Sequence, residues 1–169
     1  MLAFRNVQAD PADPVESWPY EGLVAALERG GFRDWQRVAA AIERDPWGEV
    51  AADVRAYLSY EQPYGVGPLM TSVIAAARAH AQEKDKATVA SRVRELVASS
   101  GLTRRAFADA MGTSVTRLST YCTGSVTPSA ALLLRMERTS ASLAGRRSPT
   151  GYRKETGHIA VDVYPLTDL

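Results

Sequence analysis

The side chains with the clearest chemical potential lie between positions 104 and 125. Arg117 could bond the acceptor edge of guanine, and Thr116 and Thr120 could bond bases or phosphates. Val115 adds an apolar side chain of the kind that contacts a thymine methyl group. Together these side chains could read the major groove of duplex DNA, provided that one helix presents them on a single outer face.

The spacing of capping residues predicts two short helices in this segment. Thr103 can cap a first helix that ends before Gly112, a residue that tolerates the left-handed conformation. Ser114 can cap a second helix over residues 115–122, which ends before Gly124. Two short helices joined by a tight glycine turn allow the second to enter a groove about 12 Å wide.

A third helix is predicted to begin at Thr127 and Pro128, because proline suits the first turn of a helix. The apolar faces of these helices and of the segment before them would form one small core. Its predicted members are Val93, Leu96, Val97, Phe107, Ala108, Met111, Leu118, Tyr121, Leu132, Leu133 and Met136.

Arg104 and Arg105 occupy the first turn of the first predicted helix, where the helix dipole disfavours positive charge. A local rule that is broken without compensation often marks a functional position. A DNA phosphate at this helix end would supply the missing partner, whereas the alternative is that both arginines simply extend into solvent. We therefore include both in the predicted DNA-binding surface.

The segment resembles the Cro/C1-type (Xre-like) helix-turn-helix of phage repressors and bacterial regulators, over about residues 87–143. The residues that carry the resemblance are Leu102, Thr103, Arg104, Phe107, Ala108, Gly112, Ser114, Leu118, Ser119, Tyr121, Gly124, Thr127, Pro128 and Ser129. The resemblance implies a lambda-repressor-like domain that binds duplex DNA. Two structural positions depart from the family pattern: Thr113 replaces an apolar residue, and Cys122 stands where Glu is frequent.

The resemblance also implies roles for single residues. The position of Arg104 touches a phosphate in that family, and the positions of Val115, Thr116 and Thr120 face base edges. Three further hydroxyl positions reach the DNA backbone, namely Ser114, Thr123 and Ser125. The complete predicted DNA-binding set is Arg104, Arg105, Ser114, Val115, Thr116, Arg117, Thr120, Thr123 and Ser125.

Charge is concentrated in the same region, although the net charge of the chain is only +1. Residues 85–147 hold 10 Lys and Arg against 4 Asp and Glu, whereas residues 1–84 hold 8 against 12. Residues 148–169 hold 2 against 3. A basic part between acidic flanks indicates a chain that meets phosphate with one part only.

The remaining pattern predicts an all-α protein. Apolar residues at helical spacing indicate helices within 20–27, 32–42 and 47–58, the third with Pro46 in its first turn. Residues 69–100 contain no Gly or Pro and could form one helix about 48 Å long. Its polar middle, residues 80–86, fits either a solvent-exposed helix between two domains or a short loop, and we expect the helix.

These elements give four predicted parts: an irregular segment over 1–17, a helical domain over 18–80, a helix-turn-helix domain over 81–147 and a tail over 148–169. The tail could hold one short strand near residues 158–164, where β-branched residues partly alternate with others. The helical domain is expected to form a dimer contact or to hold a partner protein.

Other chemistries find little support. A single cysteine, Cys122, excludes an intramolecular disulfide and a cysteine-based metal cage, and His80 and His158 lack ligand spacing. No nucleotide loop or catalytic triad motif is present, so we expect no metal, no cofactor and no enzymatic activity. The N-terminus lacks the features of a secretory signal, and no segment is long and apolar enough to cross a membrane, which favours the cytoplasm.

Aromatic residues of the first half, Trp18, Tyr20, Trp35, Trp47, Tyr57, Tyr60 and Tyr64, are expected to form the core and a partner surface rather than a ligand pocket. The sequence therefore predicts a dimeric, sequence-specific DNA-binding regulator, most simply a repressor. The main alternative is an antitoxin-like or adaptor protein that binds a partner and autoregulates through the same domain. A helical enzyme is the third and weakest reading.

Overall fold

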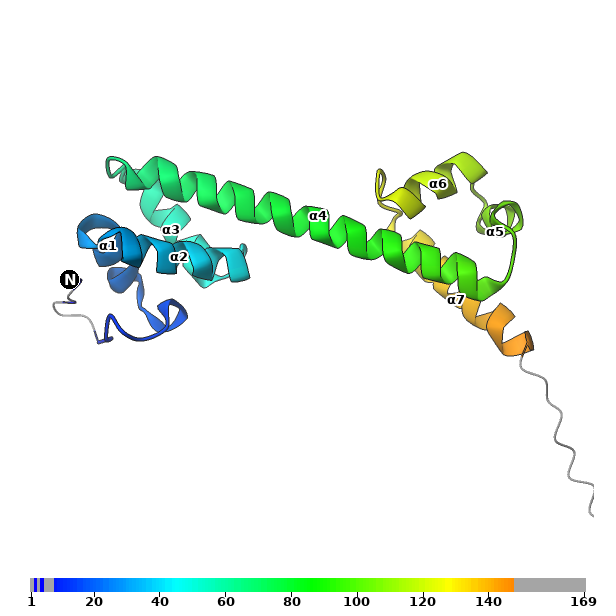
Figure 1. Ribbon diagram of the computed structural model, residues 1–169, viewed down its shortest axis with the longest axis horizontal. Helices are drawn as coiled ribbons and strands as arrows, with labels where there is room; N and C mark the ends of the chain where they lie inside the picture. The colour runs from blue at the N-terminus through cyan, green and yellow to red at the C-terminus, as the bar shows by residue number, and fades with distance from the viewer. Residues whose placement is uncertain (1, 3, 5–7, 148–169) are drawn as a thin grey trace, which may run out of the picture.

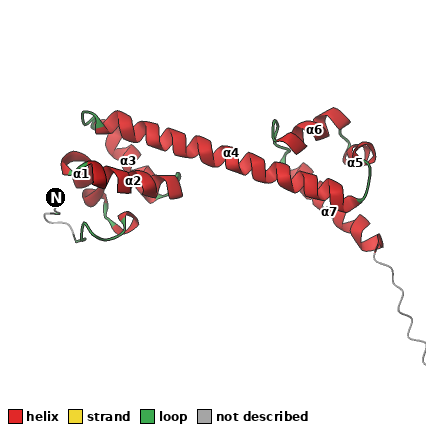
Figure 2. Ribbon diagram, viewed as in Figure 1, coloured by secondary structure: helices red, strands yellow, loops and turns green. Residues whose placement is uncertain are grey.

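The computed structural model describes residues 2, 4 and 8–147, and this part of the chain is all-helical (Figures 1 and 2). A short 3-10 helix, Val15–Ser17, precedes seven α-helices. The helices are α1 (Tyr20–Arg29), α2 (Phe32–Arg44), α3 (Glu49–Tyr60), α4 (Val66–Ser100), α5 (Arg104–Met111), α6 (Val115–Thr123) and α7 (Ala130–Arg147). The all-α prediction is confirmed, and the possible strand near 158–164 lies outside the described residues.

A first group of helices, the N-terminal cluster, consists of α1, α2, α3 and the first half of α4 (Figure 1). Its helices match the three apolar stripes of the sequence. Its buried core contains Val15, Trp18, Leu23, Ala26, Leu27, Val38, Ala41, Ile42, Val50, Ala51, Val54, Tyr57, Leu58, Val66, Met70, Ile74 and Ala77. The acidic first half of the chain thus forms a hydrophobic core of its own within the residues that the structure describes.

Polar groups at the margin of this core are hydrogen-bonded. The indole Nε1 of Trp35 donates to the carbonyl O of Ala26 at 3.0 Å, which joins α2 to α1. The hydroxyl of Tyr57 donates to Glu28 at 3.1 Å. Burial, followed by that hydrogen bond, raises the pKa of Tyr57 to about 12.

The prediction that Pro46 lies in the first turn of α3 was wrong. The helix begins at Glu49, and Gly48 precedes it as the N-cap residue. Pro46 instead belongs to a turn closed by a 3.1 Å bond from the N–H of Gly48 to the carbonyl O of Asp45. Its ring is buried, and its carbonyl accepts from Arg78 of α4 at 2.9 Å.

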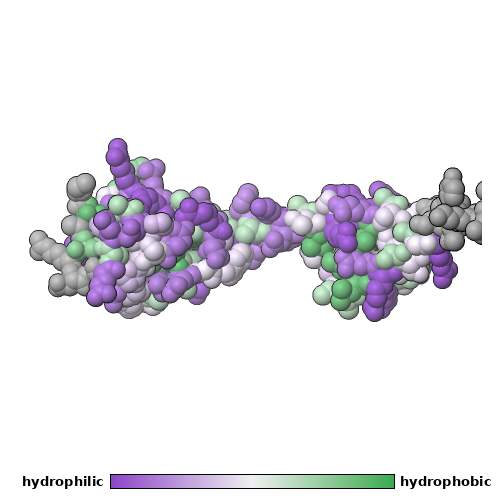
Figure 3. Space-filling view, turned by 90° about the horizontal axis from the view of Figure 1, so that it is seen from below, coloured by the Kyte–Doolittle hydropathy of each residue, from purple (hydrophilic) through white to green (hydrophobic). Residues whose placement is uncertain are grey.

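The long helix α4 is confirmed and is longer than predicted. It has 35 residues, which corresponds to about 52 Å. It begins at Val66 because Gly67 and Pro68 fall in its first turn, where backbone N–H groups need no helical partner. Figure 3 shows a narrow, largely hydrophilic middle between two wider bodies.

The second group, the motif cluster, consists of the second half of α4 with α5, α6 and α7. Its buried members are Val93, Leu96, Phe107, Ala108, Met111, Leu118, Tyr121, Cys122 and Met136. Val97, Leu132 and Leu133 pack against them as half-buried residues. Every residue predicted for this core therefore belongs to it, and Cys122 is added as a buried member and Val89 and Leu102 as half-buried ones.

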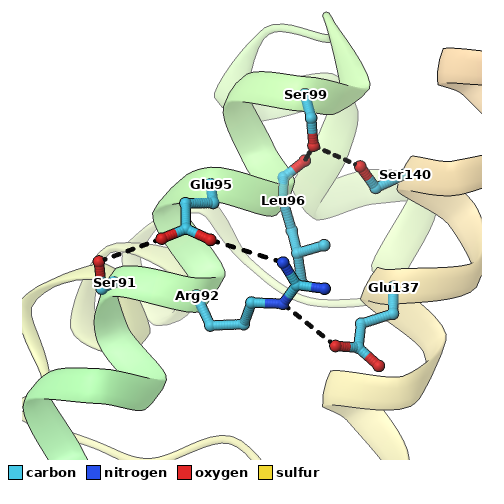
Figure 4. Close-up of polar contacts among 7 residues, drawn as sticks. All are labelled: Ser91, Arg92, Glu95, Leu96, Ser99, Glu137 and Ser140. Atoms are coloured by element: carbon cyan, nitrogen blue, oxygen red, sulfur yellow. Dashed lines mark hydrogen bonds and ion pairs between the residues drawn. The ribbon is translucent and has the colours of Figure 1, made fainter.

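Helices α4 and α7 are joined by polar contacts along their shared side (Figure 4). The guanidinium of Arg92 pairs with Glu137 at 3.2 Å and with Glu95 of its own helix at 3.5 Å. The hydroxyls of Ser99 and Ser140 are 2.7 Å apart. The ion pairs are about half exposed, so each contributes at most about 1 kcal/mol, and they orient α7 more than they stabilise it.

The predicted start of this last helix at Thr127 and Pro128 was also wrong. Helix α7 begins at Ala130, because the Ser129 hydroxyl accepts from the N–H of Leu132 at 3.3 Å and acts as the cap. Among the described residues, no helix combines the length and the apolar character needed to cross a bilayer.

Candidate nucleic-acid interface

The first motif helix, α5, forms as the sequence predicts. Thr103 lies in extended backbone, and its hydroxyl accepts from the N–H of Ala106 at 3.2 Å. Gly112 ends the helix with a φ of 68°, a left-handed conformation that glycine adopts without strain. Phe107 and Met111 are buried, so they fix the inner face of α5 against the motif cluster.

The second motif helix, α6, follows after a two-residue connection. The hydroxyl of Ser114 accepts from the N–H of Arg117 at 3.1 Å, which fixes the N-terminal end of α6. Gly124 ends the helix with a φ of 81°. The helix extends to Thr123, one residue beyond the predicted end, and both predicted caps are confirmed.

Helix α6 has a buried face and an exposed face. Leu118, Tyr121 and Cys122 point into the core. The opposite side presents Val115, which is 45% exposed, together with the exposed side chains of Thr116 and Arg117. Thr120 is half-buried at the edge of this face. The four side chains predicted to read bases thus lie on one short helix, although Thr120 is the least accessible of them.

The hydroxyl groups near the end of α6 already have local partners. Thr120 donates to the carbonyl O of Arg117 at 2.8 Å, and Thr123 donates to the carbonyl O of Thr120 at 3.1 Å. Thr123 and Ser125 are 2.9 Å apart through their side-chain oxygens. These oxygens keep free lone pairs and can accept from base amino groups, whereas donation to a phosphate requires rotation of the hydroxyl.

The arginines of the motif cluster divide into two sets. The side chains of Arg104, Arg105 and Arg117 are exposed and make no hydrogen bond or ion pair within the part of the chain that the structure describes. By contrast, Arg94 donates to the carbonyl O of Cys122 at 2.6 Å, and Arg135 donates to the carbonyl O of Met111 at 3.3 Å. The first set carries charge that is available to a ligand, whereas the second is used inside the fold.

The roles of Arg94 and Arg135 were not predicted. Each brings positive charge to the C-terminal end of one motif helix, where the helix dipole favours it and where carbonyl groups lack helical partners. Their partners are backbone atoms 28 and 24 residues away in sequence. A residue-type pattern carries no signal for such contacts, because any residue can supply the carbonyl.

The unfavourable charge at the start of α5 is confirmed as a structural feature. Arg104 and Arg105 lie in its first turn, and that turn contains no acidic residue. The backbone N–H groups of a first helical turn and two exposed arginine residues therefore share one helix end, an arrangement that attracts an anion. Among the described residues, no group of three or more His, Cys, Asp or Glu side chains is placed to hold a metal ion.

A comparison with protein families agrees with this geometry. Residues 88–141 match the family model of a helix-turn-helix domain. The matched range includes the end of α4, all of α5 and α6, and most of α7. No characterised protein and no solved structure gives a significant match to the chain. The match and the exposed arginines imply that this domain has DNA as its partner.

Proposed function

We propose that this chain, in which residues 88–141 form a Cro/C1-like helix-turn-helix domain, is a sequence-specific transcriptional regulator and acts as a repressor. The observation that carries the proposal is the set of three exposed arginines without partners on the two motif helices, Arg104, Arg105 and Arg117. Basic side chains that are exposed and form no ion pair fit a polyanion. A DNA-binding role fits the expected location in the cytoplasm, and we assign the protein no catalytic residue.

Base reading is assigned to α6. It has nine residues, and its outer face offers one guanidinium, two hydroxyls and one branched apolar group. Arg117 fits the N7 and O6 acceptors of guanine, and Val115 fits a thymine methyl. The hydroxyl oxygens of Thr116 and Thr120 fit amino groups of adenine or cytosine.

Backbone contact is assigned to residues around the ends of the motif helices. Arg104 and Arg105 start α5, whereas Thr123 and Ser125 lie at the end of α6. Ser114 precedes α6 and uses its oxygen as a cap, which leaves its hydroxyl proton free to donate. Such contacts position the domain on the duplex without reading sequence.

The protein is proposed to bind as a dimer. One short reading helix contacts few base pairs, and two-fold pairing doubles the site. The motif cluster buries its aromatic residues Phe107 and Tyr121 and exposes only the aliphatic side chains of Val115, Val126 and Leu134 among its large apolar residues that the structure describes. The N-terminal cluster exposes the aromatic side chains of Phe32, Trp47, Tyr60 and Tyr64. Exposed aromatic residues are enriched in protein interfaces, so we place the dimer contact within residues 18–80.

Replacing Arg117 with alanine is expected to weaken binding at the preferred site by roughly 1–3 kcal/mol and to relax base preference at one position. Replacing Arg104 with alanine is expected to weaken binding to all sequences about equally. The measurement is a binding-site selection from random duplexes, followed by titration of the selected site.

Arg138→Ala is the matched control, because it removes the same charge from α7 and its guanidinium bonds only the carbonyl of Leu134 one turn away. All three side chains are exposed, so melting curves should not change. If Arg117→Ala selects the same sequence as the unmodified protein, base reading belongs to Thr116 and Thr120 instead.

A fragment that begins at Lys86 is expected to be monomeric and to bind the selected operator more weakly than the full chain. It retains the complete motif cluster, which has its own core, but lacks the proposed dimer contact. Analytical ultracentrifugation gives the mass, and circular dichroism verifies that the fragment is helical. Dimerisation as strong as that of the full chain would place the contact in the motif cluster and contradict the proposal.

A second candidate function follows from the same exposed aromatic residues. Trp47 is 52% exposed and Tyr60 is 63% exposed, a pattern that also suits a different partner protein. In that case the chain is an antitoxin-like or adaptor protein, and operator binding serves autoregulation. Tight operator binding by the purified protein alone favours the first candidate, and binding that requires a co-purified partner favours the second.

A further inference from the structure

The helix that connects the two clusters also belongs to both of their cores. Met70, Ile74 and Ala77 of α4 are buried in the N-terminal cluster. Val93 and Leu96 of the same helix are buried in the motif cluster. No separate linker intervenes, so the position of one cluster relative to the other is set by a single rigid element (Figure 1).

The reading helix is fixed directly to this element. The guanidinium of Arg94 on α4 bonds the carbonyl O of Cys122 at the end of α6, at 2.6 Å. Gly124 lies so close that a Cβ atom added to it would be 3.5 Å from the Cβ of Ala90 and 3.7 Å from the carbonyl O of Lys86. A rotation of α4 about its axis therefore carries α6 with it.

The other end of α4 is fixed to the N-terminal cluster by similar means. Arg78 donates from Nε to the carbonyl O of Pro46 at 2.9 Å. The same guanidinium lies 5.8 Å from the centre of the Trp47 ring. These contacts fix the rotation of α4 about its own axis relative to each of the two clusters.

Between these anchors, α4 has two turns without side-chain packing. All side chains from Gln82 to Thr88 are exposed. Their hydrogen bonds and ion pairs stay within the helix: Lys86 pairs with Glu83 at 2.6 Å, and Thr88 donates to the carbonyl O of Lys84 at 2.8 Å. This exposed segment, residues 82–88, contains no Gly or Pro and is continuous with packed helix on both sides, which keeps it helical.

We propose that α4 determines which arrangement of two half-sites the dimer binds, by fixing the rotation and the distance of each reading helix relative to the dimer contact. The inference rests on the proposed function, a dimer joined through the N-terminal cluster. A dimer of this class reads half-sites one helical turn of DNA apart, about 34 Å, or a multiple of it. In this chain α4 is about 52 Å long and carries the motif cluster at the end opposite to the N-terminal cluster. The exposed segment therefore sets operator geometry without touching DNA.

The test is to change the length of the exposed segment between Lys84 and Asp85. Two inserted alanines rotate the motif cluster by about 200° relative to the N-terminal cluster, at about 100° per residue. Seven inserted helix-forming residues rotate it by about 700°, which is about 20° short of two full turns. Both insertions lie outside both cores, and they leave the residues of α6 unchanged.

Binding-site selection is carried out with the unmodified full chain and with both insertion variants. We expect the unmodified protein to select two symmetric half-sites. The seven-residue variant should select the same half-sites in the same relative orientation but at a different spacing, because each α4 is about 10 Å longer. Its affinity for that selected site should lie within about tenfold of the affinity of the unmodified protein for its own site. The two-residue variant should lose the paired arrangement and retain only single half-site binding, which corresponds to a loss of about 100-fold or more in affinity for the paired site.

Selection of the unmodified operator by both variants would overturn the proposal, because the motif clusters would then be oriented by contacts with each other. Loss of paired binding in both variants, with dimer mass and helicity intact, would also overturn it. In that case binding would not depend on the angle through which the insertion rotates the motif cluster. Failure of the unmodified protein to select any duplex would instead contradict the proposed function.

Discussion

Replacing Phe107 with alanine is expected to destabilise the motif cluster by about 3–5 kcal/mol, because the ring is fully buried and its removal leaves a cavity. That amount is a large part of the stability of a small domain. The three tryptophans of the chain, Trp18, Trp35 and Trp47, all belong to the other cluster. Tryptophan fluorescence therefore reports the N-terminal cluster, whereas circular dichroism reports both.

In this variant, part of the helical signal should melt at lower temperature while the tryptophan transition stays in place, and DNA binding should be lost. Ile42→Ala is the matched control in the opposite cluster, where an equally buried side chain is removed at a cost of about 2–5 kcal/mol. It should shift the tryptophan transition. If each substitution lowers both transitions equally, α4 couples the clusters into one cooperative unit and the two-domain prediction fails.

Affinity for the selected operator is expected to fall by about 150-fold between 50 and 200 mM salt, if Arg104 and Arg105 of two protomers neutralise about four phosphates. The reason is release of counterions from the duplex, with a slope of about −0.9 for each phosphate contact. Titration at four or more salt concentrations gives this slope. The net charge of +1 would not suggest so steep a dependence, because the negative charge of the N-terminal part offsets most of the positive charge of the motif cluster.

Arg104→Ala provides the comparison for this prediction. It removes one contact per protomer, so the slope should become shallower by about two contacts for a dimer. Arg138→Ala should leave the slope unchanged. A salt dependence close to zero for the unmodified protein would contradict phosphate contact by the arginines of α5.

The motif helices could be predicted from sequence because the interactions that delimit them are local. Thr103 and Ser114 each cap the helix that follows, within three residues, and Gly112 and Gly124 each adopt the left-handed conformation that ends a helix. Residue type alone indicates these roles. The apolar faces of the same helices follow from the helical spacing of their apolar residues, so the motif core was predicted as well.

The errors arose where several local signals compete. Both wrong helix starts came from placing proline in the first turn. At α7, the start of the helix could fall at Thr127, Pro128 or Ser129. Ser129 is the cap, because its hydroxyl accepts from the N–H of Leu132. At α3, Pro46 is drawn into a turn by the bond between Gly48 and Asp45, and its carbonyl is used by a distant arginine. The sequence limits each helix start to a few neighbouring residues, and the contacts of the folded chain determine which of them begins the helix.

The candidate site shows the same division. The exposure of Arg104, Arg105 and Arg117 follows from their position opposite the apolar faces of their helices. The inward use of Arg94 and Arg135 does not, because it depends on how α4 and α7 cross the ends of α6 and α5. The sequence shows ten basic residues within 85–147. It does not show which of them bond to backbone carbonyls inside the fold and which remain available to a ligand.

The exposed segment of α4 has a consequence for how this gene can change over time. Its side chains pack on no other helix, so nearly any helix-forming residue can occupy residues 82–88 without cost to either core. The number of residues is constrained much more strongly, because one added or lost codon turns the reading helix by about 100°. Point mutations there should accumulate freely while deletions and insertions are removed by selection, a pattern of conserved length without conserved identity.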